Sequence, residues 1–271
     1  MKFVLNLAQS AGKIVAQHFG RVRRLTKTHA AASAEAVTDA DRASQRFILA
    51  ALRKRFADDG FIGEENDAGD AITCQNPAQG NRVWIIDPLD GTNNFCAGLG
   101  AFAVCIGLFE AGHPVLGVVY DVTRDLTYWA ARGQGAWLNK QRLRAAASPL
   151  NDSSLLMLTS NCCDARGRPP AYAIRWISQT TWKLRMLGSA ALESAQVAAG
   201  IAHGAVTVQG KLWDLAGQAA ILLEAGAIVT DLAGKPIFPY ATDGYSGGKV
   251  PFLAAGPKAH RQLLEEIARQ S

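Results

Sequence analysis

Apolar and polar residues recur along this chain with two different periods, and each period predicts one kind of element. Apolar residues three or four positions apart are typical of amphipathic helices, whereas short β-branched and aromatic runs between turn residues are typical of strands. The helical pattern covers Leu5–Phe19, Thr38–Phe56, Ser189–Ala199, Trp213–Ala225 and Pro257–Arg269. The strand pattern covers Val83–Ile86, Phe102–Phe109, Pro114–Tyr120, Thr127–Ala131, Ala136–Leu138 and Ser154–Thr159.

Cap and turn residues mark the expected limits of these elements. Thr38 or Asp39 is expected to cap the second helix, and Gly200 and Gly226 are expected to end two later helices. Two pairs of strands are separated by the hairpin-like turns EAGH and RGQG. The strands therefore form meander-like groups with helices before and after them. This order indicates layered α+β structure with largely antiparallel sheets, rather than repeated βαβ units.

Composition is that of an ordinary globular protein. The 271 residues are 49% hydrophobic and 19% charged, and the chain is long enough to bury a sizeable core. No apolar run reaches the roughly 18 residues that suggest a membrane span. The first twenty residues are interrupted by Asn6, Gln9, Ser10 and Lys13, so we interpret them as an amphipathic helix and not as a signal peptide.

Cysteine usage and charge narrow the class of protein further. The five cysteines include no Cys-x-x-Cys pair, which favours reduced thiols in a cytoplasmic protein. The net charge is +5, and Arg21, Arg23, Arg24 and Lys27 form a short basic stretch. Such a stretch can bind nucleic acid, but without interleaved aromatic residues it favours a solvated face. A mild positive field also favours small anionic substrates.

Four short segments of the sequence contain carboxylates that are candidate metal ligands or catalytic groups. Glu64 follows the apolar pair of FIGEEN, and Asp87 and Asp90 follow the apolar run of RVWIIDPLDGT. Asp214 begins an apolar helix, and Asp41 lies in VTDADR. Each fragment alone is commonly a helix cap or a solvated turn. Their occurrence together predicts a site for a hard cation such as Mg²⁺, which prefers oxygen ligands and substrate phosphate.

The residues between and after the paired aspartates suit this chemistry. Pro88 stiffens the turn, and the Leu89 carbonyl between the two acids can reach the same metal. Gly91 allows a bulky ligand to approach the main chain. If a helix begins near Thr92, its free N–H groups form a phosphate site. The stretch therefore predicts a centre that holds metal ions and phosphate together.

At this point the sequence resembles the inositol monophosphatase family of Mg²⁺-dependent, lithium-sensitive phosphatases. The resemblance rests on GEEN, on the near-complete signature WIIDPLDGTNNF, on LWDLAGQAAILLEAGAIVTDLAGKP and on VTDAD, and the middle strands follow the family in GVVYDVTRDLTYWAARGQGAWLN. It covers essentially the whole chain. The resemblance implies a hydrolase with an α/β/α/β/α sandwich of the inositol monophosphatase and fructose-1,6-bisphosphatase type, and it implies a homodimer.

The resemblance also implies an organisation and a set of site residues. We expect one domain over residues 1–271, with an N-terminal part to about residue 147 and a C-terminal part from about residue 148. Two to three Mg²⁺ ions are expected on Glu64, Asp87, the Leu89 carbonyl, Asp90 and Asp214. The expected catalytic residues are Thr92, Asp41 and Glu64. The expected substrate-binding residues are Asp90, Gly91, Thr92, Gly188, Ser189, Ala190, Gln209 and Asp214.

One departure from the family pattern concerns the substrate. Inositol-specific members carry a glutamate shortly before the Trp-Asp pair, but here counting back reaches Thr207 and alignment on the nearby glycine reaches Val208. No acidic residue occurs between Glu193 and Asp214, and the polar candidates are Gln209 and Lys211, the latter for a second anionic group. Histidinol phosphate, fructose bisphosphate, NADP and nucleotide bisphosphates, which other members hydrolyse, therefore stay open as substrates.

Three functions from different classes are compatible with these residues. The leading hypothesis is a Mg²⁺-dependent phosphomonoesterase for a small polyol or sugar phosphate. The second is a regulatory protein that keeps the fold but binds a protein or RNA, for which the basic stretch is the sequence support. The third is a glycosidase with paired carboxylates, which needs neither the phosphate seat nor so many acids. Metal dependence would separate the first from the third.

Overall fold

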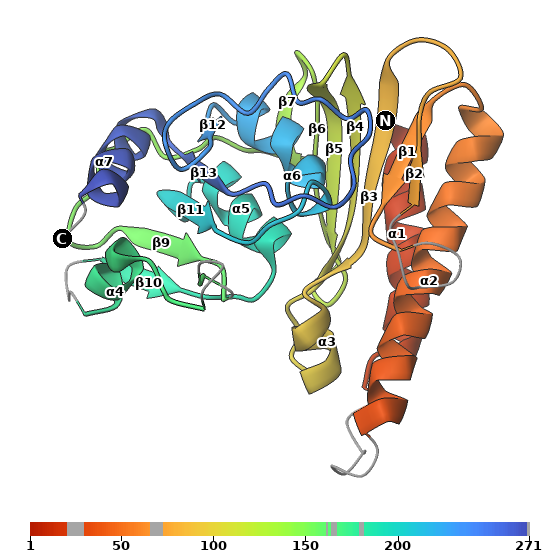
Figure 1. Cartoon of the computed structure of the whole chain (residues 1–271), viewed down its shortest axis with the longest axis horizontal. Coiled ribbons are helices and arrows are strands. Elements are labelled where there is room, and N and C mark those ends of the chain that lie inside the picture. The colour runs from red at the N-terminus through yellow and green to blue at the C-terminus, as the bar shows by residue number, and fades with distance from the viewer. Residues whose placement is uncertain (21–29, 66–72, 161, 164–166, 179–181, 270–271) are drawn as a thin grey trace.

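Helical layers alternate with two β-sheets in this protein (Figure 1). The computed structural model describes residues 1–20, 30–65, 73–160, 162–163, 167–178 and 182–269. Helices α1 and α2 cover the outer face of the larger sheet, α5 and α6 lie between the sheets, and α4 and α7 pack beside the smaller sheet. The expected α/β/α/β/α arrangement is therefore confirmed.

The helices and strands have the following bounds. The helices are α1 (Lys2–His18), α2 (Ala30–Arg55), α3 (Thr92–Ala97), α4 (Ala171–Ser178), α5 (Ala190–Ala198), α6 (Trp213–Glu224) and α7 (Pro257–Ala268). The strands of the larger sheet are β1 (Gly60–Gly63), β2 (Thr73–Gln75), β3 (Arg82–Asp90), β4 (Ala103–Glu110), β5 (His113–Asp121), β6 (Leu126–Ala131), β7 (Gly135–Leu138) and β8 (Gln141–Arg142). Those of the smaller sheet are β9 (Leu155–Leu158), β10 (Lys183–Arg185), β11 (Gly204–Thr207), β12 (Ile228–Thr230) and β13 (Phe252–Ala255).

The two sheets differ in strand direction. The larger sheet has the order β2-β1-β3-β4-β5-β6-β7-β8, and within it β1 and β3 pair in parallel while the other pairs are antiparallel. The smaller sheet has the order β10-β9-β11-β13-β12 and combines two parallel pairs with two antiparallel pairs. The expectation of largely antiparallel sheets thus holds for the larger sheet, whereas the smaller one is mixed. The division of the chain near residue 147 stays a prediction.

The predicted elements are present within a few residues of their expected limits, with one exception. Helix α2 begins at Ala30, so Thr38 and Asp39 lie inside the helix and the predicted cap there is wrong. The Ala-rich run from Ala30 to Ala36 has a high helix propensity, which allows the helix to start before the Thr-Asp pair. None of the described helices is both long and apolar enough to cross a membrane.

Close packing of α6 on the larger sheet brings the two halves of the site together. A Cβ atom on Gly107 of β4 would lie 2.5 Å from the Ala216 carbonyl oxygen, and one on Gly117 of β5 would lie 2.2 Å from the Gly217 carbonyl oxygen. Only glycine leaves room for the helix backbone at these two positions. The first turn of α6, which carries Asp214, is therefore held directly over the sheet.

Candidate active site

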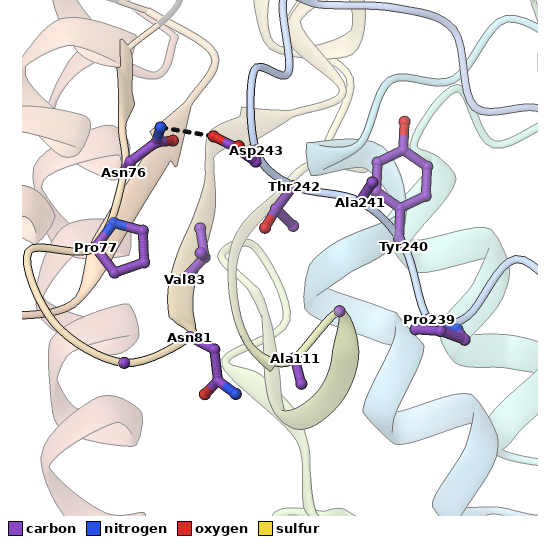
Figure 2. A pocket seen from close by; sticks show the side chains of 12 residues that line it. Asn76, Pro77, Asn81, Val83, Ala111, Pro239, Tyr240, Ala241, Thr242 and Asp243 are labelled. Atoms are coloured by element: carbon purple, nitrogen blue, oxygen red, sulfur yellow. Dashed lines mark hydrogen bonds between the residues drawn. The ribbon is translucent and has the colours of Figure 1, made fainter.

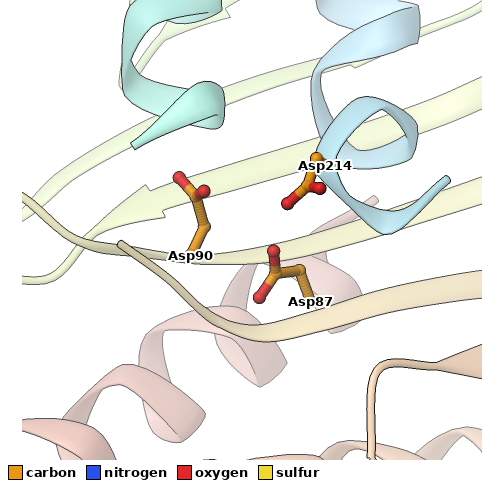
Figure 3. A group of neighbouring side chains, drawn as sticks. All are labelled: Asp87, Asp90 and Asp214. Carbon is orange, nitrogen blue, oxygen red and sulfur yellow. The ribbon is translucent and has the colours of Figure 1, made fainter. Parts of the chain in front are cut away.

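Three carboxylates from distant parts of the chain meet near the end of β3 (Figure 3). Asp87 and Asp90 belong to β3, and Asp214 belongs to the first turn of α6. One oxygen atom of each lies within 4.8 Å of those of the other two. Asp87 and Asp90 are buried, and Asp214 is half-buried. The structure thus brings together three of the predicted metal ligands.

A break in the strand register allows both β3 aspartates to face Asp214. Residues three positions apart point to opposite faces of a regular strand. Here the pairing of β3 with β4 shifts between Asp87 and Asp90, and Pro88, which has no N–H to donate, lies inside the shift. The Ser44 hydroxyl donates to the Pro88 carbonyl (3.0 Å), and the Leu89 N–H donates to the Asp87 carboxylate (3.1 Å). One hydrogen bond from α2 and one within the bulge therefore hold its shape.

Parallel pairing places Glu64 beside the cluster. Gly63 at the end of β1 pairs with Ile86 of β3, so Glu64 and Asp87 follow at the same edge. The Glu64 and Asp87 carboxylates are close enough that each affects the pKa of the other. The main chain that carries it is held one residue later, where Gln45 accepts a hydrogen bond from the Glu65 N–H (3.1 Å). Strand pairing and a contact from α2 therefore position this fourth acid.

Asp90 is oriented by the start of α5. Its carboxylate accepts hydrogen bonds from the Ser189 hydroxyl, the Ala190 N–H (3.1 Å) and the Ala191 N–H (3.1 Å). Ser189 is also the N-cap of the helix, since its hydroxyl oxygen accepts the Leu192 N–H (3.2 Å). A carboxylate at a helix N-terminus satisfies free N–H groups and interacts favourably with the helix dipole. Asp90 thus connects β3 to α5.

Asp214 is held by its own end of α6. Its carboxylate accepts the Lys211 N–H (2.6 Å), and its carbonyl accepts a hydrogen bond from the Gln218 side chain. The chain before it is fixed by Tyr245, whose hydroxyl accepts the Leu212 N–H (2.9 Å) and donates to the Gly248 carbonyl (2.7 Å). These contacts leave the carboxylate directed toward Asp87 and Asp90, as Figure 3 shows.

Burial and mutual repulsion raise the pKa values of these acids. Burial, followed by the charges of Glu64 and Asp90, raises the pKa of Asp87 well above its usual range. The pKa of Asp90 rises to about 7, through burial and then the charge of Asp214, against its three hydrogen bonds. Burial, followed by the charge of Asp214, raises the pKa of Glu64 to about 8. Without a cation the cluster therefore favours protonation.

These residues fit a divalent metal ion. The donor set is made of carboxylate oxygens, which Mg²⁺ prefers, and their spacing allows one ion to contact several of them. The same repulsion that raises their pKa values is removed when a cation lies between them. The arrangement is that of a metal-binding centre at the edge of a sheet.

Comparison with known proteins identifies the family. The model described as "Inositol monophosphatase family" matches residues 1–271. The chain belongs to the inositol monophosphatase family. It is 34% identical to the "Fructose-1,6-bisphosphatase/inositol-1-monophosphatase" of Thermotoga maritima over 235 residues, which are 87% of this chain and 86% of that protein. It is 32% identical to "Nus factor SuhB" of Pasteurella multocida over 268 residues, 98% of this chain and 95% of that protein.

A solved structure confirms the fold. The crystal structure of extragenic suppressor protein suhB from Bartonella henselae matches with a TM-score of 0.82 at 26% sequence identity, and the match covers 99% of each chain. The chain therefore has the layered fold of this family as well as its sequence motifs. The family includes proteins whose names describe different activities, so membership alone does not fix the substrate.

The turn after β3 carries the other residues expected from the family. Gly91 has a φ of +91°, and a Cβ atom there would lie 2.7 Å from the Ala101 carbonyl oxygen, so a larger residue does not fit. Helix α3 starts at the next residue, and the Thr92 hydroxyl donates to the Leu89 carbonyl (3.0 Å). Thr92 is thus hydrogen-bonded to the Leu89 carbonyl, which is a predicted metal ligand.

Asp41 approaches the cluster from α2. It is buried, and its Oδ1 atom has no hydrogen-bond partner among the described residues. Burial, followed by the charges of Glu64 and Glu65, raises the pKa of Asp41 to about 9. The Thr92 hydroxyl donates to a carbonyl in this structure. The Thr92–Asp41 pairing expected from the resemblance stays a prediction.

A cavity of about 190 Å³ adjoins the cluster and includes Asp90 and Asp214 in its wall. The predicted substrate-binding residues Gly188, Ala190 and Gln209 also line it. The remaining lining residues are Thr159, Ser160, Thr207 and Gly210, of which Thr159, Ser160 and Gly210 were not predicted as substrate contacts. Counting back from the Trp-Asp pair had pointed to Thr207, while Val208 packs against the core of the smaller sheet. Hydroxyl groups and an amide therefore form much of the wall.

The two polar candidates for substrate contact have different surroundings. Gln209 lines the cavity, and its side-chain nitrogen donates to the Cys163 carbonyl. The Lys211 ammonium group donates to the Gly247 carbonyl, and Lys211 is not among the described residues of the cavity wall.

The basic stretch from Arg21 to Lys27 lies outside the described residues.

A larger cavity of about 580 Å³ lies at the other end of β3, beside Val83 (Figure 2). Four residues of extended strand, roughly 13 Å, separate Val83 from Asp87. One wall carries Asn76 and Pro77, the other carries Tyr240 and Asp243, and the Asn76 amide donates to Asp243 (2.6 Å). None of the clustered acids lines this cavity, so the candidate active site is the smaller one.

Proposed function

We propose that this chain is a Mg²⁺-dependent phosphomonoesterase that hydrolyses a small polyol or sugar phosphate of the inositol 1-phosphate type. The observation that carries the proposal is the cluster of Asp87, Asp90 and Asp214 beside a cavity of about 190 Å³. Burying several carboxylates together costs free energy unless their charge is compensated. A metal-dependent reaction on an anionic substrate is a direct reason to keep them.

The proposed roles of the residues follow from their placement. Two to three Mg²⁺ ions would be held by Glu64, Asp87, the Leu89 carbonyl, Asp90 and Asp214. Bound there, the ions would make a water more acidic and balance the charge that develops during in-line phosphoryl transfer. The main chain of Gly91 and Thr92 would seat the phosphate, close to Asp90.

Asp41 and Thr92 are the proposed groups that orient the attacking water and accept its proton. The buried Oδ1 of Asp41 has no described partner, which supports an acceptor role for it. Thr92 follows Gly91, so its hydroxyl lies next to the proposed phosphate seat. Glu64, whose carboxylate lies beside that of Asp87, would assist as a further acid of the centre.

The cavity wall supports a neutral alcohol as the leaving group. Gly188, Ala190 and Gln209, which line the cavity, would form the alcohol side of the substrate site. Ser189, predicted with them, is 1% exposed and bonded to Asp90, so it would act by holding this segment. Among the described residues that line the cavity, none carries a positive charge. A second phosphate group would gain no ion pair there, so we favour a monophosphate over fructose bisphosphate, NADP and nucleotide bisphosphates. Histidinol phosphate is the alternative monoester.

The test is phosphate release from a panel of esters, with and without Mg²⁺. The panel contains both inositol monophosphates, glycerol 2-phosphate, histidinol phosphate, fructose bisphosphate, NADP and 3′-phosphoadenosine 5′-phosphate. We expect Mg²⁺-dependent release from the monophosphates of neutral alcohols, with the bisphosphates slower. Release that is independent of metal, or no release from any ester, would contradict the proposal.

The second candidate is a regulatory role through binding of a protein or RNA. The similarity to a protein named "Nus factor SuhB" along nearly the whole chain favours it. The intact acid cluster favours the hydrolase, because a purely binding protein has no need of it. Lithium inhibition and a homodimer are expected from the family resemblance, and a cytoplasmic location is expected from the cysteine usage. All three stay predictions.

A further inference from the structure

A buried carboxylate in the first turn of α5 holds the chain that precedes the helix. Glu193 is 1% exposed, and its Oε1 atom accepts the N–H groups of Leu187 (2.8 Å) and Gly188 (3.2 Å). Its Oε2 atom has no partner among the described residues. One oxygen of this carboxylate therefore holds the main chain at Leu187 and Gly188, which belong to no strand or helix.

A second side chain holds the same segment from the opposite side. The Asn94 amide, in α3, donates to the Leu187 carbonyl (2.7 Å) and to the Ala101 carbonyl (2.7 Å). Gly188 packs directly against Asn94, because a Cβ atom on Gly188 would lie 3.0 Å from the Asn94 side-chain oxygen. The 187–188 segment is therefore clamped between α3 and α5.

The residues that follow this clamp are the donors that orient Asp90. Ser189, Ala190 and Ala191 supply the three hydrogen bonds to its carboxylate, and two of them come from the main chain. Main-chain donors can be aimed only by fixing the chain that carries them. Glu193 fixes that chain immediately before the first donor.

We propose that Glu193 is a positioning residue for Asp90, acting through the 187–188 segment, so that the centre binds Mg²⁺ tightly. This inference rests on the proposed function, because it takes Asp90 as a metal ligand. Residues that orient a metal ligand without contacting the metal commonly change metal affinity or activity by about 10- to 100-fold when they are removed. A merely structural carboxylate would change the stability of the fold and leave metal affinity intact.

The test is Mg²⁺ binding measured by isothermal titration calorimetry on the metal-free full chain. We expect Glu193→Ala to raise the Kd for Mg²⁺ by about 10-fold or more, because two N–H groups lose their acceptor. Glu193→Gln keeps an acceptor oxygen at the same reach, so we expect its Kd within about 3-fold of wild type. Unchanged Mg²⁺ affinity in folded Glu193→Ala would overturn the proposal.

Glu224 offers a matched control elsewhere in the chain. Its carboxylate also accepts two main-chain N–H groups, from Gly133 (2.8 Å) and Gly135 (2.7 Å), in a turn next to β7. Glu224 is the last residue of α6, about 15 Å along the helix from Asp214 in its first turn, and its two partners lie at the start of β7, four strands from β3. Glu224→Ala therefore removes two equivalent hydrogen bonds away from the acid cluster. We expect it to lower thermal stability and leave the Kd for Mg²⁺ unchanged. An equal loss of Mg²⁺ affinity in Glu224→Ala would also overturn the proposal.

A double-mutant cycle with Ser189 tests the route of the effect. If Glu193 acts through the donors to Asp90, Ser189→Ala and Glu193→Ala share one cause, and the double variant loses less affinity than the product of the two single losses. Strictly multiplicative losses would contradict that route. Should Glu193→Ala fail to fold, Glu193→Asp, whose carboxylate is one methylene shorter, is measured in the same way and with the same expectation.

Calorimetry separates this inference from the proposed function. Wild-type chain that binds Mg²⁺ but releases phosphate from no ester, together with weakened binding in Glu193→Ala, would overturn the hydrolase and support the positioning role. Phosphate release by wild type, together with unchanged Mg²⁺ binding in Glu193→Ala, would support the hydrolase and overturn the positioning role. Absence of Mg²⁺ binding in the wild type would overturn both.

Discussion

The two ends of β3 present cavities of opposite character. At its start, a cavity of about 580 Å³ has among its described lining residues a single acid, Asp243, which is bonded to Asn76. At its end, a cavity of about 190 Å³ includes two buried or half-buried carboxylates in its wall. Volume alone would select the start of the strand. The concentration of buried charge, which costs free energy without a partner, selects the end.

The largest expected effect contrasts one aspartate from each end. Asp90→Asn removes a charge from the cluster, and metal stabilisation of phosphoryl transfer is worth several kcal/mol, so we expect kcat/KM to fall by about 1,000-fold. Asp243→Asn at the other end keeps a hydrogen-bonding side chain and should leave kcat/KM within about 2-fold of wild type. Initial rates at saturating Mg²⁺ on the best ester of the panel measure both.

The opposite ranking would contradict the choice of the smaller cavity as the candidate active site. If folded Asp90→Asn turned over at the wild-type rate while Asp243→Asn was inactive, the larger cavity would be the active site. Circular dichroism and thermal unfolding of both variants establish that each is folded before the rates are compared.

The second effect links pH, metal and stability. The folded-state pKa values of Glu64 (about 8) and Asp90 (about 7) lie above their unfolded values near 4. Their contribution to stability is therefore fully present below about pH 4 and is lost as the pH rises through 7 and 8. We expect the Tm of the metal-free chain to fall across this window. Added Mg²⁺ replaces the protons, so it should raise Tm by at least about 3 °C at pH 8, with a smaller gain at pH 5.

Asp243 again provides the contrast, since it is the single acid among the described residues that line the larger cavity. Asp243→Asn should show the same dependence of Tm on pH and Mg²⁺ as wild type, whereas Asp90→Asn should show a weaker one. A metal-free Tm that rises from pH 5 to pH 8 would contradict the stated direction of the carboxylate pKa values.

The two β3 aspartates could be predicted from sequence because their signals are local, whereas Asp214 was joined to them by the combination of motifs and the family resemblance. Asp87 and Asp90 lie in one short signature that also contains Pro88 and Gly91, each with a recognisable backbone role. The cavity wall could not be predicted in the same way. Thr159 and Thr207 come from the ends of different strands of the smaller sheet, and no spacing along the chain indicates that they meet.

Weak local patterns explain the errors in the fold. The short strands β11, β12 and β13 have three or four residues each, too few to establish a period of two. Helix α4 follows two prolines and was not predicted. The start of α2 was placed too late, because Thr38 and Asp39 are typical cap residues while the alanines before them favour a helix. Propensity summed over several residues outweighed one cap signal.

The third effect concerns the close packing that holds Asp214 over β3. A Cβ atom on Gly117 would lie 2.2 Å from the Gly217 carbonyl oxygen of α6, so Gly117→Ala must displace the helix. We expect a loss of about 1–3 kcal/mol in the free energy of unfolding, and a lower kcat as Asp214 moves. Gly248→Ala is the control, because a Cβ atom there meets open space. Urea denaturation of both variants measures the difference, and equal losses would contradict the packing argument.

The smallest effect is expected at the start of β3, where charges are compensated by their neighbours. Asp59 accepts the Trp84 indole N–H (2.7 Å) and pairs with Arg82 (3.2 Å), whose side chain is 39% exposed. Asp59→Asn keeps an acceptor for Trp84 and removes only an ion pair that solvent already screens, so we expect a loss of less than about 1 kcal/mol. Mg²⁺ affinity and kcat should be unchanged, because this acid lies at the end of the strand away from the cluster. Urea denaturation and calorimetry test the two statements separately. A change in Mg²⁺ affinity would mean that the two ends of β3 are coupled through the strand, and the contrast between them would then be one of degree.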